Sequence, residues 1–572
     1  MTKILKNILL ILFLFCIGCQ SFDIHTKTNT VCNPMNLSYN FLLGEELRRD
    51  ICCPCIVLYE DIYYLFASNL KGYYCSEDLM QWTFIYTNLP VPVNAPTVMT
   101  MNKELYFISS FQGAQALYKT NQPETGQWEI VTDKFLYSVE EPMLFCDEKR
   151  LFLYSGIGDA EKLTGIELDP QTWHPIDSAR LLLKSDKMNN GWENPGDYNE
   201  WIPEQPWIDG LWMTRYNGKY YLQYASPGTY LKSSNSGVYI SDTPEGPFML
   251  AAHNPFAYKP EGFVTGAGNG CIFQDKYENY WYVGSVAVTS KYILERRLSL
   301  YPVFFDNDGI LYAYTGFGDY PMYIPDRKIN VPEDLFPDWM LLSYNKQTHV
   351  SSELRKHPAC CAVDENIRSW WSAQSGNKGE YLSVDLEEQC KVNAIQINFA
   401  DHDFTLSDAV EKSYYQYYIE SSEDGRNWHL IADRSENCQN APHDYIQFDE
   451  PIRSRFLRIT NVHCPSRKFS LSGFRVFGKA NKKIPKQAKI YTATRDITDR
   501  RKVILKWKSV DNAIGYNIRY GTSCDKLYHN YMVYDDTEIV IRSLQASQNY
   551  FFTIDSFNEG GISRGKVIMA VQ

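Results

Sequence analysis

Residues 54–66 of the 572-residue chain are PCIVLYEDIYYLF: an apolar run, a polar turn at Glu60 and Asp61, and a strand rich in aromatic side chains. Five copies of this unit lie between about residue 52 and residue 305, with their turns and strands at residues 60–64, 102–107, 147–152, 217–221 and 277–281. The copies close on aromatic residues, namely Trp82, Trp128, Trp173, Phe248 and Phe304. A period of roughly 40–50 residues built from short strands is typical of propeller blades. We therefore predict an all-β chain in which residues 41–335 form a five-bladed β-propeller, with the functional pocket on its axis.

Two further domains follow the repeats. Alternating apolar and polar residues in short strands predict a jelly-roll sandwich over residues 342–480. The Lys-rich stretch at residues 479–489 is typical of a linker. Residues 488–572 predict a small sandwich, in which Leu544 precedes Tyr550 by six residues, the spacing of a tyrosine corner.

Composition restricts the partners. The net charge of −12 argues against nucleic acid, because no basic stripe offsets the acidity. Aromatic residues make up 15% of the chain. This content suits an ordinary β-rich core, and it also suits sugar binding, since an aromatic ring can stack on the apolar face of a pyranose. The expected partner is a polysaccharide or oligosaccharide.

The N-terminus predicts a targeting segment. Lys3 and Lys6 precede an apolar run at residues 8–17, which is the pattern of a signal peptide over residues 1–19. This segment ends in Gly18-Cys19, which resembles a bacterial lipobox. Cys19 is therefore the expected lipidation site. A plain cleaved signal is the alternative. With lipidation, residues 20–40 would be a tether to the membrane, and the protein would lie on the outer membrane of the cell envelope.

The cysteines do not predict a metal site. Cys52, Cys53 and Cys55 form a cluster, but the sequence has no second Cys or His pair at ligand spacing. We therefore expect no structural zinc.

Taken together, these segments resemble a bacterial glycoside hydrolase of family 43 over roughly residues 47–325. The resemblance is carried by residues 54–68 in the first blade, 210–225 in the fourth and 266–275 in the fifth. Residues 345–478 resemble a discoidin-type (coagulation factor 5/8 type C) domain, a common sugar-binding partner of such enzymes. Residues 488–572 resemble fibronectin type III. The resemblance implies hydrolysis of plant-type polysaccharides that contain arabinose, xylose or galactose.

The family's inverting chemistry uses a general-base Asp, a general-acid Glu, and an Asp that tunes the pKa of the acid. The resemblance maps the base onto Cys53, the acid onto Asp209 and the tuning residue onto Glu141, so all three positions are substituted. A thiol with a pKa of about 8.5 is mostly protonated at neutral pH and lacks the two oxygens of a carboxylate. The acid is shortened by about 1.5 Å, although catalytic geometry must hold to about half an ångström.

Other pocket residues follow from the same resemblance. The family's fifth-blade His, which lies near an axial water or metal ion, is Asn269 here, and this weakens the expectation of an axial calcium ion. No other cofactor is expected. Asn94 and Trp212 are expected to line the pocket.

Two alternatives could replace the missing base. Asp50 lies three residues before Cys53, and on an extended strand that offset points to the opposite face. Cys53 could itself be a nucleophile, but this needs a nearby base or cation. Arg296 and Arg297 either reach the pocket or are ordinary solvated or strand-pairing charges.

Two functional hypotheses therefore remain. The chain is either a glycoside hydrolase of weak or lost activity, or a non-catalytic glycan-binding protein of the cell envelope. A purely structural adhesion protein is a third, less specific alternative.

Overall fold

The computed structural model describes residues 29–42, 47–110, 115–135, 139–158, 163–288, 290–404 and 413–572. The predicted signal peptide and Cys19 lie outside these residues. The described chain consists of β-strands and short 3₁₀ turns, and none of its described helices has the length and apolarity of a membrane span. It divides into two compact units: residues 342–364 with 369–480, and residues 29–341 with 365–368 and 481–572.

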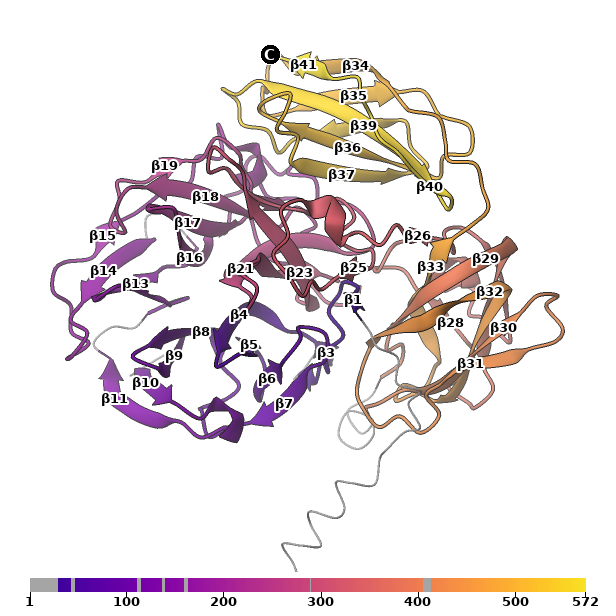
Figure 1. The fold of residues 1–572 in the computed structure, drawn as a ribbon, viewed down its shortest axis with the longest axis horizontal. Coiled ribbons are helices and arrows are strands. Elements are labelled where there is room, and N and C mark those ends of the chain that lie inside the picture. Colours follow the sequence, from indigo (N-terminus) through magenta and orange to yellow (C-terminus); the bar gives the residue numbers. More distant parts are fainter. Residues whose placement is uncertain are drawn as a thin grey trace, which may run out of the picture. The chain divides into compact units, whose positions relative to one another are not determined.

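Five antiparallel sheets, each built from consecutive strands, occupy residues 52–313 and are named blades 1 to 5 in chain order. Figure 1 shows these sheets arranged around one centre. Their strands are β4 (Cys52–Tyr59), β5 (Ile62–Ser68), β6 (Gly72–Ser76) and β7 (Thr83–Tyr86); β8 (Asn94–Met101), β9 (Glu104–Ser110), β10 (Gln115–Thr120) and β11 (Glu129–Phe135); β12 (Met143–Asp147), β13 (Arg150–Ser155), β14 (Thr164–Leu168) and β15 (Arg180–Leu181); β16 (Asp209–Tyr216), β17 (Lys219–Ser226), β18 (Asn235–Ser241) and β19 (Met249–Leu250); β21 (Thr265–Gln274), β22 (Tyr280–Ala287), β23 (Arg296–Phe305) and β24 (Leu311–Ala313). In blade 4, β20 (Ala257–Tyr258) also pairs with β18.

The inner strands of the blades share a backbone irregularity where they begin. A residue with left-handed φ stands there in every blade: Cys53 (+50°), Ala95 (+42°), Glu141 (+50°), Gly210 (+60°) and Asn269 (+42°). In blades 1, 2, 4 and 5 the strand register also breaks beside this residue. Such a conformation costs a non-glycine residue on the order of 1–3 kcal/mol, so it persists only where the surroundings enforce it.

Serine hydroxyl groups at the ends of the second strands provide part of that enforcement. The backbone N–H of Cys53 donates to Ser285 Oγ at 3.0 Å, and that of Ala95 donates to Ser68 Oγ at 2.7 Å. Glu141 N–H donates to Ser110 Oγ at 2.6 Å. Each bond joins one blade to the preceding one, and Ser285 joins blade 5 to blade 1.

The segment before the first blade is packed, not extended as a tether. β1 (Thr30–Val31) pairs with β25 (Met322–Tyr323), and β2 (Phe41–Leu42) pairs with β3 (Arg48–Arg49). Leu37 and Tyr39 are buried, and Met35 N–H donates to the Leu298 carbonyl at 2.9 Å. The prediction of a tether is therefore wrong for residues 29–40, because their apolar side chains belong to the propeller core.

The C-terminal residues form a sandwich of two sheets. One contains β34 (Ile490–Arg495), β35 (Val503–Trp507) and β38 (Glu538–Ile541); the other contains β36 (Gly515–Gly521), β37 (His529–Tyr534), β39 (Tyr550–Asn558), β40 (Gly561–Ser563) and β41 (Met569–Val571). Gln545 N–H donates to the Tyr550 hydroxyl at 3.0 Å, the contact of a tyrosine corner.

This sandwich belongs to the same compact unit as the propeller. Arg501 donates to the Lys187 carbonyl at 2.6 Å, and the rings of Tyr312 and Tyr528 stack at 3.8 Å. The predicted Lys-rich linker lies along the sandwich, since Asn558 Nδ2 donates to the Lys483 carbonyl at 2.8 Å. The backbone of this stretch is therefore bound to the sandwich at Lys483 and Lys486.

The other unit is a single β domain with its own core. Its sheet has the order β33 (Ser470–Lys479), β29 (Tyr381–Phe399), β32 (His443–His463), β30 (Gln416–Ser422) and β31 (His429–Asp433), with β27 (Gln347–Val350) on β29 and β28 (Trp371–Ser372) on β33.

Short 3₁₀ turns occur in both units, at Pro123–Thr125, Gly191–Glu193, Pro332–Leu335 and Ala359–Ala362.

Candidate functional site

Asn269 joins two carboxyl groups from different blades. Its Nδ2 donates to Glu141 Oε2 at 2.8 Å and to Asp209 Oδ1 at 3.2 Å. The backbone N–H of Gly210 also donates to Glu141 Oε2 at 3.0 Å. All three side chains are between 5% and 7% exposed. Blades 3, 4 and 5 thus bring three of the predicted site residues into direct contact.

Cys53 approaches this group from blade 1, but its thiol has a different partner. Cys53 Sγ contacts Cys52 Sγ at 3.3 Å. Ser285, which accepts from the Cys53 N–H, in turn donates from Oγ to the Asn269 carbonyl at 3.1 Å. The hydrogen bond to Cys52 and then burial raise the pKa of Cys53 well above its ordinary value, and the charge of Glu141 adds to this shift. The position at which the general base is expected therefore holds a neutral thiol at neutral pH.

The two carboxyl groups also favour their protonated forms. Burial, followed by the negative charge of Asp209, raises the pKa of Glu141 to about 8. Burial raises the pKa of Asp209 to about 7, although the hydrogen bond from the Trp207 indole opposes the shift. The pair consequently retains at least one proton at neutral pH, and a protonated carboxyl is the state that a general acid requires.

A buried ion pair lies within electrostatic range of the site. Arg296 holds both oxygens of Asp50, with Nε–Oδ1 at 2.8 Å and Nη2–Oδ2 at 2.7 Å, and donates from Nη1 to Thr229 Oγ1 at 2.8 Å. The positive charge of Arg296 opposes, but does not cancel, the rise in the pKa values of Glu141 and Asp209. The interpretation of Arg296 as a solvated charge is therefore wrong.

The position of Asp50 also differs from the sequence argument. Because the strand register breaks between Cys52 and Cys55, an offset of three residues does not fix the face on which Asp50 lies. Asp50 nevertheless has both oxygens bound by Arg296, and Asn69 Nδ2 donates to Oδ2 at 3.0 Å. A carboxylate that is held in this way is poorly placed to accept a proton from water.

Arg297 contacts the segment that precedes the first blade. Its guanidinium lies over the Tyr39 ring at 5.1 Å and donates to the Arg49 carbonyl at 2.7 Å. It anchors the N-terminal segment to the propeller.

The two remaining pocket predictions have separate positions. Asn94 is exposed, and its Oδ1 accepts from Ser68 Oγ at 3.2 Å, beside Ala95 at the start of the second inner strand. Trp212 packs against four apolar clusters of the propeller and donates from Nε1 to the Ile272 carbonyl at 2.9 Å. Trp212 therefore fills the core between blades, and the described contacts do not join it to the polar group.

Sequence reasoning missed Trp207 and Ala95. Trp207 is 49% exposed and donates from Nε1 to Asp209 Oδ2 at 2.7 Å, so it presents an aromatic surface next to the acid position. The aromatic residues that precede Asp209 could have indicated it. The dipeptide Ala95-Pro96 repeats the patterns Cys53-Pro54 and Glu141-Pro142, which marks the equivalent axial position of blade 2.

The residues at the axis do not fit a metal ion. The Asn269 amide directs its nitrogen to both carboxyl groups, and a nitrogen that donates there has no lone pair for a cation. Within the described ranges, no group of three or more His, Cys, Asp or Glu side chains could hold a metal ion.

The five antiparallel sheets form a β-propeller in which carboxyl groups from different blades meet through Asn269. More specifically, residues 49–311 match the family model described as glycosyl hydrolases family 43. Residues 347–472 match the F5/8 type C domain. The chain therefore contains a glycosyl hydrolase family 43 domain followed by an F5/8 type C domain.

Solved structures of this kind are similar to the chain at low identity. An endo-1,4-β-xylanase from Bacteroides thetaiotaomicron is 19% identical, with a TM-score of 0.39, and the match covers 46% of this chain and 94% of that one. An α-L-arabinofuranosidase from Clostridium thermocellum is 17% identical, with a TM-score of 0.36 and coverages of 48% and 95%. The Bacteroides ovatus protein "Xyloglucan PUL GH43B" is 13% identical, with a TM-score of 0.41 and coverages of 95% and 98%. No curated protein matches the chain.

Proposed function

We propose that the propeller binds a glycan containing arabinose, xylose or galactose at its axis and hydrolyses it slowly or not at all. The observation that carries this proposal is the neutral thiol of Cys53, which contacts Cys52 at the position of the general base. A general base must accept a proton from the attacking water, and a neutral thiol cannot.

The rest of the site is compatible with sugar binding. Asp209, with its pKa raised to about 7, can donate a hydrogen bond to a sugar oxygen at neutral pH. Trp207 offers an exposed ring beside it, on which the apolar face of a sugar can stack. An acid without a base leaves an inverting reaction incomplete, because water and leaving group must be activated from opposite faces.

Hydrolysis remains the second candidate, and one observation favours it. The protonated form of Asp209 is the form that a general acid uses. This candidate needs another base, and Asp50 is bound at both oxygens by Arg296.

The test is a panel of arabinose-, xylose- and galactose-containing polysaccharides, assayed in parallel for binding and for released sugar. The proposal expects binding to at least one of them without release at ordinary enzyme rates. Release at rates of about 1 s⁻¹ or more would contradict it and support the second candidate.

The flanking regions extend the proposal to the cell envelope. Cys19 supports lipid anchoring to the outer membrane, the F5/8 type C domain supports a second contact with the polysaccharide, and the sandwich at residues 488–572 supports a fibronectin type III-like module. Labelling of the expressed protein with a radioactive fatty acid tests the anchor. Cys19→Ala should abolish the label, and a label that survives this change would contradict the assignment.

A further inference from the structure

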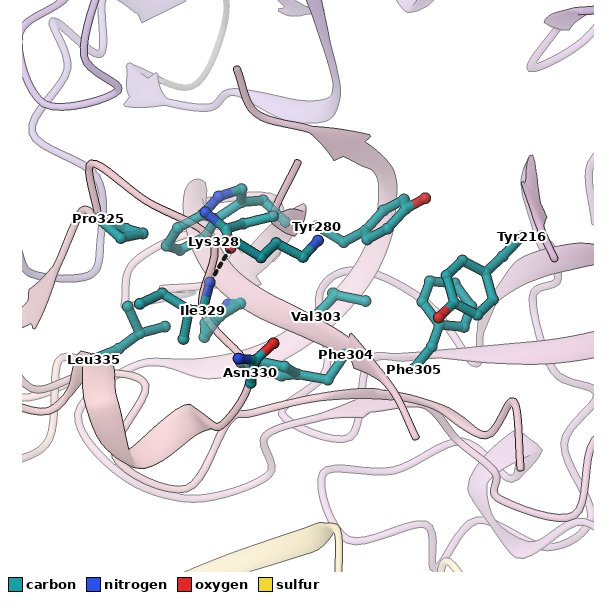
Figure 2. A pocket seen from close by; sticks show the side chains of 13 residues that line it. Tyr216, Tyr280, Val303, Phe304, Phe305, Pro325, Lys328, Ile329, Asn330 and Leu335 are labelled. Atoms are coloured by element: carbon teal, nitrogen blue, oxygen red, sulfur yellow. Dashed lines mark hydrogen bonds between the residues drawn. The ribbon is translucent and has the colours of Figure 1, made fainter. Parts of the chain in front are cut away.

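A cavity lies at the opposite end of strand β16 from the carboxyl pair. Asp209 and Tyr216 are the first and last residues of β16, and Tyr216 lines this cavity of about 150 Å³. Blade 5 and the segment that follows it supply the other walls, including Tyr280, Phe304 and Phe305 (Figure 2). A cavity of this size admits a six-membered ring.

The walls of the cavity are largely aromatic. Tyr216 and Phe305 stack with their ring centroids 3.8 Å apart, and Tyr280 meets the Phe305 ring edge to face at 5.2 Å. These rings are held by one another and are only partly buried, so they form a rigid surface. Such a surface suits the apolar face of a sugar ring.

The polar side chains at the cavity are one cation, two amides, two tyrosine hydroxyls and the Trp281 indole. Lys328 and Asn330 are both exposed and line the cavity, and the Lys328 side chain extends toward Tyr280 (Figure 2). Lys328 Nζ lies 5.6 Å from the Tyr280 ring centroid and donates to the Glu278 carbonyl. None of the residues that line the cavity carries a carboxylate, although the chain as a whole has a net charge of −12.

We propose that this cavity binds a uronic acid residue of a polysaccharide, with the sugar ring against the aromatic walls and its carboxylate at Lys328. An anionic substituent complements the Lys328 charge better than a neutral sugar does, because no carboxylate lines the cavity. The inference rests on the proposed function, because it takes the chain to be a glycan-binding protein. It concerns a site separate from the axis.

The test measures binding of a xylo-oligosaccharide that carries one glucuronic acid and of the neutral oligosaccharide of the same length. Wild-type protein is compared with Lys328→Met, which keeps the apolar stem and removes the charge. Lys276→Met is the matched control, because Lys276 Nζ also lies over a tyrosine ring, at 5.7 Å, and donates to a carbonyl, but does not line the cavity.

Wild type should prefer the uronate-bearing oligosaccharide, and Lys328→Met should lose that preference by roughly 10- to 100-fold, the value of a charged hydrogen bond. Lys276→Met should keep it. The inference is overturned if Lys328→Met retains the preference, or if inorganic sulfate competes as well as free glucuronic acid does. The polysaccharide panel tests the proposed function separately: no binding to any neutral member of the panel, with the Lys328-dependent preference intact, would overturn the proposed function but not this inference.

Discussion

Blades 1 and 3 begin with the same backbone and different chemistry. Cys53 and Glu141 both have a φ of +50°, both precede proline, and both donate their N–H to a serine hydroxyl of the preceding blade. The Glu141 carboxyl then meets Asn269, whereas the Cys53 thiol meets Cys52. This comparison indicates that serine hydroxyls and backbone geometry hold the axis, so the side chain at an axial position can change while the fold is retained.

The largest expected effect is on the rate of hydrolysis, when carboxyl groups of the expected lengths are placed at positions 53 and 209. Cys53→Asp combined with Asp209→Glu should raise hydrolysis of a glycan that the protein binds by at least about 100-fold, since a general base and a general acid each contribute on the order of 10²–10⁴. Sugar release at saturating glycan is the measurement. Cys53→Ser with Asp209→Glu is the control and should show no gain.

An unchanged rate in the double variant, with binding preserved, would mean that the pocket has lost more than its base. A wild type that is already fast, and that Cys53→Ala slows, would show that the thiol has a catalytic role.

A smaller effect is expected from removing the serine that holds blade 1. Ser285→Ala leaves the Cys53 N–H and the Asn269 carbonyl without their partner in a buried site, which should cost about 1–3 kcal/mol in the free energy of unfolding. Denaturant unfolding measures it. Ser178→Ala, at an exposed position, should stay within about 0.5 kcal/mol of wild type.

Ser110→Ala tests the same role in blade 3, because Ser110 accepts a hydrogen bond from the Glu141 N–H. It should also destabilise the protein, but less than Ser285→Ala, since Ser110 is only partly buried. Equal stability of the two serine variants and wild type would contradict the view that these hydroxyls hold the axis.

The smallest effect concerns pH. Burial raises the folded-state pKa of Glu141 from 4.5 to about 8, so between these values the folded protein holds a proton that the unfolded chain has released. This contribution to stability is fully present below about pH 4.5 and is lost as the pH rises through about 8. Glu141→Gln should therefore reduce the fall in Tm between pH 5 and pH 9.

The exposed neighbour Glu140 supplies the control: Glu140→Gln should leave the pH dependence of Tm unchanged. If Glu141→Gln and Glu140→Gln behave alike, Glu141 is already ionised in the folded protein.

The sequence predicts the architecture well because the strand pattern of each blade is local. The turn at Glu60 and Asp61 and its four repeats coincide with turns between first and second strands. The sequence also places Glu141, Asp209 and Asn269 on one axis by their offset from these turns, and the structure brings them into contact.

The remaining features of the site could not be predicted from the sequence, because they depend on irregular backbone and on contacts between residues far apart in the chain. A strand argument places Asp50 away from the site, but the register break and the positive φ of Cys53 remove the regular alternation on which the argument depends. Arg296 lies 246 residues from Asp50, so the pair has no local signature. Trp212 carries the residue type expected of a sugar pocket, yet its contacts are with apolar clusters.

The most direct test of the central claim follows the anomeric proton signals of a bound oligosaccharide by NMR during long incubation with wild-type protein. Line broadening reports binding, and new anomeric signals report hydrolysis in the same sample. A neutral thiol at the base position predicts broadening with no new signals over many hours. New signals of the inverted anomer at enzyme-like rates, abolished in Asp209→Asn, would contradict the account.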